Sequence, residues 1–155
     1  MTDADLHHTV ATARLWAATR QPYLASALFA LSVQLDAGCD TIAVDRAWNL
    51  HADPAHLARL PPQELGALLL HLVGHLLRDH ADRAARTGVE ADNQREWWNR
   101  CADAEINDDL QDLGIVPASA PDLPHDLHAS ERDLAERYYE SAPTGPRRWD
   151  CGSGV

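Results

Sequence analysis

Two histidines four residues apart, His71 and His75, lie in an apolar run whose length and composition favour a helix. At about 100° per residue, their side chains lie about 40° apart around the helix, so both imidazoles can reach one metal ion. Burying two imidazole rings among leucines costs on the order of a few kcal/mol unless the rings are satisfied. A shared metal ion would satisfy both rings at once, and hydrogen bonds to backbone carbonyls are the alternative.

A zinc site needs a third protein ligand, and two residues are candidates. Asp103 lies on the next predicted helix, which could fold back antiparallel and present its carboxylate to the histidine pair. Asn107 follows one turn later on the same face of that helix. His80 is the second candidate, but it lies about 140° around the helix from His75. It can join the site only if the helix breaks after Leu77.

The elements that must position these residues are mainly helical. Apolar residues at helical spacing predict a first helix over 6–17, and a second apolar stretch over 23–35 predicts another helix. Residues 41–45 and 47–51 are rich in β-branched and aromatic side chains with rough alternation, which predicts a short sheet of two or three strands. The predicted fold class is therefore α+β and mainly helical.

The central helix carries the histidine pair. Asp53 is placed to cap a short helix over 55–60, and Glu64 lies where the next helix begins. Leucines and other apolar residues between 65 and 77 cover most of the circumference, which predicts a helix buried in the middle of the domain. Gly88 is a suitable residue to end the helical region.

Two further helices are predicted after this region. The one that carries Asp103 should be capped by Asp92 or Asn93 and run to about Gly114. A last amphipathic helix is expected over 130–139. With 155 residues, the chain is expected to form one domain over 1–142, followed by an extended tail or linker over 143–155.

Charge and cysteine content restrict the function further. Thirteen Lys and Arg against 24 Asp and Glu give a net charge of -11, which argues against nucleic acid or an anionic membrane as a partner. A protein or peptide partner is expected instead. Cys39, Cys101 and Cys151 form no CxxC pair, and the start lacks a basic leader, so a cytoplasmic location is expected.

The combined motifs resemble a known family. Residues 71–80 read HLVGHLLRDH, and Trp98-Asn99 and the segment ADAEIN at 102–107 follow. Over about residues 44–139 this pattern resembles a bacterial metallopeptidase domain of the zincin type. Such domains typically precede a von Willebrand factor A-like domain and accompany MoxR-type AAA+ ATPases.

The resemblance implies a zincin-like fold, with a small sheet packed on a buried HxxxH helix and a ligand on the helix that follows. By position it makes His71 and His75 ligands of Zn²⁺ and Asp103 the third ligand. It also implies a MoxR-type ATPase as a partner and a further domain after the tail. His80 becomes a motif histidine, and its role stays open.

Leu72 departs from the HExxH motif that this family usually carries. The motif glutamate acts as general base, which contributes roughly 10²–10⁴-fold, so leucine predicts severe impairment. Glu64 lies about 12 Å away along the helix axis. Glu105 points about 160° away from Asp103, and Glu96 lies about two turns before it. None of the three is an evident substitute, and no catalytic residue is assigned.

Three hypotheses follow. The first is a zinc-binding pseudoenzyme that keeps a His71, His75 and Asp103 site without full peptidase activity. The second is an active zinc metallopeptidase with a displaced base. The third is a metal-free helical interaction module whose acidic surface binds a basic partner.

Overall fold

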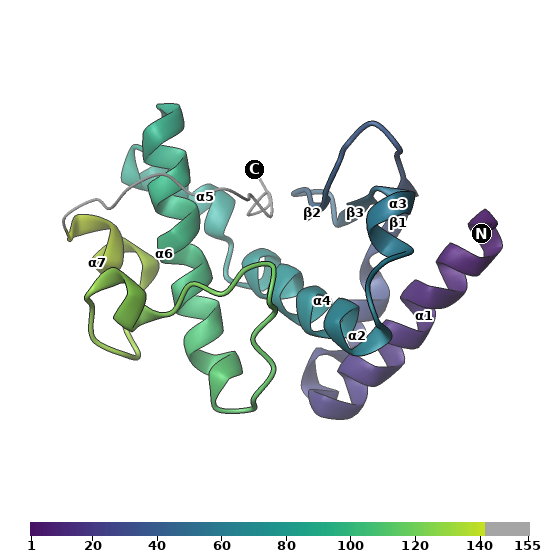
Figure 1. The fold of residues 1–155 in the computed structure, drawn as a ribbon. Coiled ribbons are helices and arrows are strands. Elements are labelled where there is room, and N and C mark those ends of the chain that lie inside the picture. Colours follow the sequence, from purple (N-terminus) through teal and green to yellow (C-terminus); the bar gives the residue numbers. More distant parts are fainter. Residues whose placement is uncertain (142–155) are drawn as a thin grey trace.

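The computed structural model describes residues 1–141 of the chain, and Figure 1 shows how they are arranged. In chain order the elements, with η for a 3-10 helix, are α1 (Asp3–Arg20), η1 (Pro22–Leu24), α2 (Ala25–Ala30), β1 (Ser32–Leu35), β2 (Ile42–Val44), β3 (Asn49–Ala52), α3 (Pro54–Leu57), α4 (Pro62–Leu77), α5 (His80–Thr87), α6 (Asp92–Gln111), η2 (Pro124–Leu127) and α7 (Ala135–Glu140). The α+β, mainly helical class is confirmed. The tail expected at 143–155 lies outside the described residues.

The predicted sheet is present and has three strands in the order β1-β3-β2. Strand β3 pairs antiparallel with β2 and parallel with β1. The helix predicted over 23–35 is wrong at its end, because α2 stops at Ala30 and the next residues form β1. Half-buried Val33 and Leu35 alternate with exposed neighbours, and pairing with β3 satisfies the backbone of this segment.

Helix α4 is the buried centre that the sequence predicted. Every residue from Leu65 to His75 is buried, and α4 packs against both α1 and β2. Asp53 caps α3 as expected, because its carboxylate accepts the N–H groups of Ala55 and His56 at 2.7 and 3.2 Å. Helix α3 ends at residue 57, earlier than predicted.

The helical region breaks after Leu77. Asp79 adopts a left-handed conformation with φ 56° and ψ 39°, and α5 begins at the next residue, His80. Gly88 ends α5 in a left-handed conformation, as the sequence indicated. The break is the condition under which His80 can approach the histidine pair.

Helix α6 crosses α4 near the C-terminal end of α4, with Asn107 beside His71 and Asp103 beside His75 (Figure 1). The crossing is close: a Cβ atom added to Gly74 would lie 2.9 Å from Ile106 Cγ2. The predicted cap at Asp92 or Asn93 is wrong, since Ala91 is the N-cap and the Gln94 side chain accepts the Ala91 N–H at 2.9 Å. The absence of a side chain at Gly74 lets α6 approach the histidine-bearing helix.

The last helix is shorter than the predicted span of 130–139. Helix α7 begins at Ala135, because the preceding segment folds against Tyr138 instead. The Tyr138 hydroxyl donates to Ser130 O at 3.0 Å and accepts the Asp133 N–H at 3.1 Å. Arg132 in this loop has φ 60°, which interrupts any helix there.

Two hydrophobic cores meet at α6. The first packs α1, α2, the sheet and α4 against Ile106 and Leu110. The second joins α5, α6, η2 and α7 around Trp97, Trp98 and Tyr138. Within residues 1–141, no helix combines the length and apolar character needed to cross a membrane.

Candidate metal centre

The structure brings His71, His75 and Asp103 together at the junction of α4 and α6. His71 Nε2 and His75 Nε2 lie 3.1 Å apart. Asp103 Oδ1 lies 3.1 Å from His75 Nε2 and 3.3 Å from His71 Nε2. All three side chains are 0% exposed. Three electron-pair donors therefore converge in the protein interior.

The size and chemistry of this triangle fit a zinc ion. Tetrahedral zinc with ligands at about 2.0–2.1 Å separates its ligand atoms by about 3.3–3.4 Å. The observed separations of 3.1–3.3 Å need only a slight expansion to match. Two imidazole nitrogens and one carboxylate oxygen are ordinary zinc ligands.

Asn107 fixes the tautomer of His71. Its Nδ2 donates to Ala120 O at 2.6 Å and to Asp122 O at 2.8 Å, so its Oδ1 is the atom facing His71. His71 Nδ1 lies 2.9 Å from that oxygen and must donate to it. A neutral His71 then presents the lone pair of Nε2 toward Asp103.

His80 fixes the tautomer of His75, although His80 is not one of the three converging ligands. The two Nδ1 atoms lie 3.0 Å apart, and His80 Nε2 lies 3.4 Å from Glu105 Oε1. If His80 directs its Nε2–H to the Glu105 carboxylate, its Nδ1 accepts the proton of His75 Nδ1. The Nε2 lone pair of His75 is thereby directed to the centre.

Glu105, His80 and His75 form a hydrogen-bonded series that we call the relay. Burial keeps its two histidines uncharged. Desolvation lowers the pKa of His75 to about 3 and also lowers the pKa of His80. Burial would raise the pKa of Glu105, but hydrogen bonds from His80 and Arg83 hold it below its usual value. The relay thus begins at a carboxylate and passes through two neutral imidazoles.

Arg83 anchors the carboxylate at the start of the relay. Its guanidinium donates to the two oxygens of Glu105 at 3.0 and 2.8 Å, and Glu105 also accepts the Ala135 N–H at 2.6 Å. Sequence reasoning missed both Glu105 and Arg83 as contributors. Helical geometry correctly directs Glu105 away from Asp103, but the break at Asp79 brings His80 to meet it.

Leu72 lies in the first hydrophobic core and is 0% exposed. The three carboxylates considered as substitute bases do not reach the centre directly. Glu64 accepts the Ala118 N–H at 2.7 Å, and Glu96 is exposed. Glu105 faces His80, which separates it from the centre. The position between the two histidines therefore provides no proton acceptor.

A cavity of about 150 Å³ lies beside the centre and is lined in part by His75 and His80. Arg46 and Asp82 line the same cavity and form an ion pair of 2.9 Å, with both side chains about half exposed.

A second group of possible ligands, Asp40, Asp53 and His56, lies near the start of α3. His56 Nδ1 lies 4.0 Å from Asp40 Oδ1 and 3.8 Å from Asp53 Oδ1, and the Asp40 side chain is 96% exposed. The wider spacing and exposure make it a poorer match to zinc than the buried triangle.

Comparison with known proteins gives one match. The model of a family described as "Putative metallopeptidase domain" matches residues 5–154. Searches of curated proteins and of solved structures gave no match.

Proposed function

The chain belongs to this family of metallopeptidase domains, and we propose that it is a zinc-binding member whose peptidase chemistry is impaired at Leu72. The convergence of His71 Nε2, His75 Nε2 and Asp103 Oδ1 within 3.1–3.3 Å carries the proposal. Their orientation by separate hydrogen-bond partners supports it, because metal-binding histidines ordinarily have their second nitrogen fixed in this way.

His71, His75 and Asp103 would hold the ion. A bound zinc ion in such a site polarises a carbonyl group and makes water more acidic. The surrounding residues orient the ligands: Asn107 directs His71, and His80 with Glu105 behind it directs His75. The side chains of His71, His75, His80, Asp103 and Asn107 are each 0% exposed, so the interior excludes bulk water from them.

Impairment follows from the chemistry of leucine. Leu72 has no atom that can accept a proton, and a positioned base is worth roughly 10²–10⁴-fold in rate. Glu105 is not a replacement, because Arg83 and His80 occupy its carboxylate. We therefore expect zinc to contribute to structure or ligand binding more than to hydrolysis.

Finer expectations remain predictions. A peptidase with a displaced base and a metal-free module that binds a basic partner are the competing functions. The zincin-like assignment, the MoxR-type AAA+ partner and the cytoplasmic location also stay predictions from the sequence.

The metal content of the purified protein tests the proposal. Elemental analysis of protein prepared without chelator should find about one zinc per chain. His75→Ala and Asp103→Ala should lose it, while His125→Ala, which changes an exposed histidine, should keep it. Circular dichroism checks that the variants fold. The proposal would be contradicted by parent protein that contains no metal as purified and that takes up none when it is refolded with added zinc.

Peptide hydrolysis tests the impairment separately. The zinc-loaded parent should cleave a varied peptide mixture no faster than the His75→Ala variant. Cleavage that a chelator stops and that His75→Ala abolishes would instead establish the active-peptidase alternative. Leu72→Glu, compared with Leu72→Gln, then asks whether a carboxylate at this position restores turnover.

A further inference from the structure

Two hollows adjoin on the surface formed by α4 and α6. The first, the apolar hollow, has a volume of about 400 Å³, and the second, the acidic hollow, about 420 Å³. Arg78, Asp109 and Asp112 line both. The two hollows are therefore neighbouring parts of one surface.

The apolar hollow exposes large side chains to solvent. Leu77 is 51% exposed, Leu113 is 46% exposed and Tyr23 is 94% exposed. Its floor includes Leu70 and Ile106, which are buried. Grouped exposed apolar side chains around a hollow are typical of a surface that binds another molecule.

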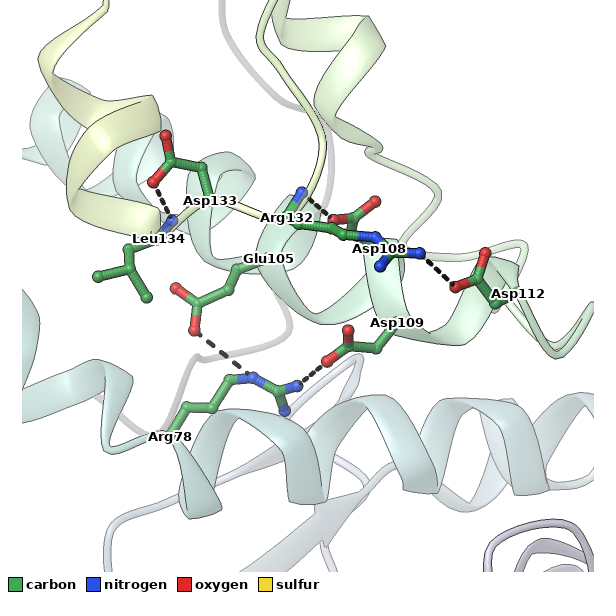
Figure 2. A pocket seen from close by; sticks show the side chains of 8 residues that line it. All are labelled: Arg78, Glu105, Asp108, Asp109, Asp112, Arg132, Asp133 and Leu134. Atoms are coloured by element: carbon green, nitrogen blue, oxygen red, sulfur yellow. Dashed lines mark hydrogen bonds and ion pairs between the residues drawn. The ribbon is translucent and has the colours of Figure 1, made fainter.

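The acidic hollow carries an excess of carboxylates, as Figure 2 shows. Its charged lining is Glu105, Asp108, Asp109, Asp112, Asp133, Arg78 and Arg132. Arg78 is held between Glu105 and Asp109, and Arg132 lies 3.9 Å from Asp112 (Figure 2). Glu105 is also paired with Arg83, so five carboxylates face three guanidinium groups, and the remaining negative charge favours a cationic group.

We propose that the two hollows form one docking surface for a polypeptide segment that combines an apolar side chain with a neighbouring Lys or Arg. The apolar side chain packs beside Leu77 and Leu113, and the basic group enters the acidic hollow. Charge complementarity selects this occupant. A second copy of this chain, with a net charge of -11, would be repelled, as would an anionic lipid or nucleic acid.

This surface is separate from the proposed zinc ligands, although it uses the same two helices. Helix α4 gives Leu70 and Gly74 to the apolar hollow and the neighbouring His71 and His75 to the metal centre. Binding at the surface therefore requires no metal, and its test does not depend on zinc.

A fluorescein-labelled amphipathic peptide of leucine and lysine is the probe, and fluorescence anisotropy of the full chain measures its binding. Peptides with Ser in place of Leu, or Glu in place of Lys, test each half of the proposal. We expect the leucine-lysine peptide to bind at least about tenfold more tightly than either comparator. Measurements with and without chelator should agree.

Paired variants locate the binding site. Leu77→Ser and Asp112→Lys should each weaken binding about tenfold. Leu15→Ser changes an exposed leucine on α1, and Glu96→Lys changes an exposed acid on α6, so both controls should leave binding within about twofold of the parent. Absence of binding, or equal weakening by Glu96→Lys and Asp112→Lys, would overturn the proposal, the latter because it indicates general charge attraction.

Discussion

At the scale of single residues, Asn107 controls which nitrogen of His71 faces Asp103. Two backbone carbonyls hold the Asn107 amide, and the amide oxygen holds the proton of His71 Nδ1. Zinc binding would then need neither loss of that proton nor rotation of the ring. The energetic benefit is preorganisation of a ligand before the ion arrives.

Asn107→Ala should therefore weaken zinc binding without removing a ligand. We expect an affinity lower by about 10–100-fold, the usual cost of losing such a partner. Competition with a chromogenic chelator measures the affinity. Asn93→Ala, an exposed change in the first turn of α6, is the matched control. Equal affinities for the two variants would mean that the Asn107 contact does not orient His71.

The three proposed ligands could be found from the sequence because each lies on a long helix with regular geometry. The spacing of His71 and His75 places them on one face of α4, and apolar neighbours of Asp103 indicate a buried face of α6. The link from Glu105 to His80 could not be found in this way. It depends on the left-handed residue Asp79, whose conformation no helical periodicity encodes.

At the scale of elements, the approach of α4 and α6 sets the separation of the ligands. Gly74 lies one residue before His75, and its missing side chain makes room for Ile106. Ile106 in turn lies one residue before Asn107, so a shift of α6 at this contact displaces Asp103 and Asn107 together. Close helix packing and metal geometry are thus linked.

Gly74→Ala should disturb both stability and zinc affinity. The added Cβ would meet Ile106 Cγ2 at 2.9 Å, and such overpacking typically costs about 1–3 kcal/mol. Urea unfolding measures the first effect, and chelator competition measures the second. In the background of Ile106→Ala, which removes that methyl group, Gly74→Ala should cost less stability and less zinc affinity. Additive effects in this double-mutant cycle would show that the two residues are not in repulsive contact.

A second link between elements depends on pH. Arg83 on α5 binds Glu105 on α6 and Glu136 on α7. The Arg83 hydrogen bonds hold the pKa of Glu136 below its ordinary value of 4.5. A carboxyl group with a lowered folded-state pKa stabilises the fold above its unfolded-state pKa. That contribution is lost as the pH falls below about 4.5.

Glu136→Gln should therefore cost about 1 kcal/mol of unfolding free energy at neutral pH, and this difference from the parent should shrink toward about pH 3. Chemical denaturation at several pH values measures it. Glu131→Gln, which changes an exposed carboxyl group, should show no such convergence. A constant difference between Glu136→Gln and the parent at all pH values would rule out the ionic link.

Sequence periodicity gave the larger elements but misassigned the shorter ones. Helices α1, α4 and α6 span 18, 16 and 20 residues, so helical spacing recurs over several turns in each. Strand β1 has only Ser32–Leu35, follows directly after a short helix and takes its conformation from pairing with β3. Helix α7 likewise starts where Tyr138 organises the preceding loop. Such tertiary contacts are not encoded in local patterns.

At the scale of the whole molecule, the metal centre lies where the two hydrophobic cores meet. Helix α4 belongs to the first core, α5 belongs to the second, and α6 contributes to both. His80, at the start of α5, also contacts the Trp98 ring at a centroid distance of 6.3 Å. An ion bound by α4 and α6 would therefore connect the two cores.

Removing zinc should lower the melting temperature of the folded domain. At a free zinc concentration about 1,000-fold above Kd, binding adds about 4 kcal/mol of stability. For a domain of this size, that is a shift on the order of 10 °C. Calorimetry of the parent with zinc, and again with excess chelator, measures the shift. His75→Ala should melt at the same temperature under both conditions. If elemental analysis shows that zinc has left the parent while its melting temperature is unchanged, the ion does not join the two cores.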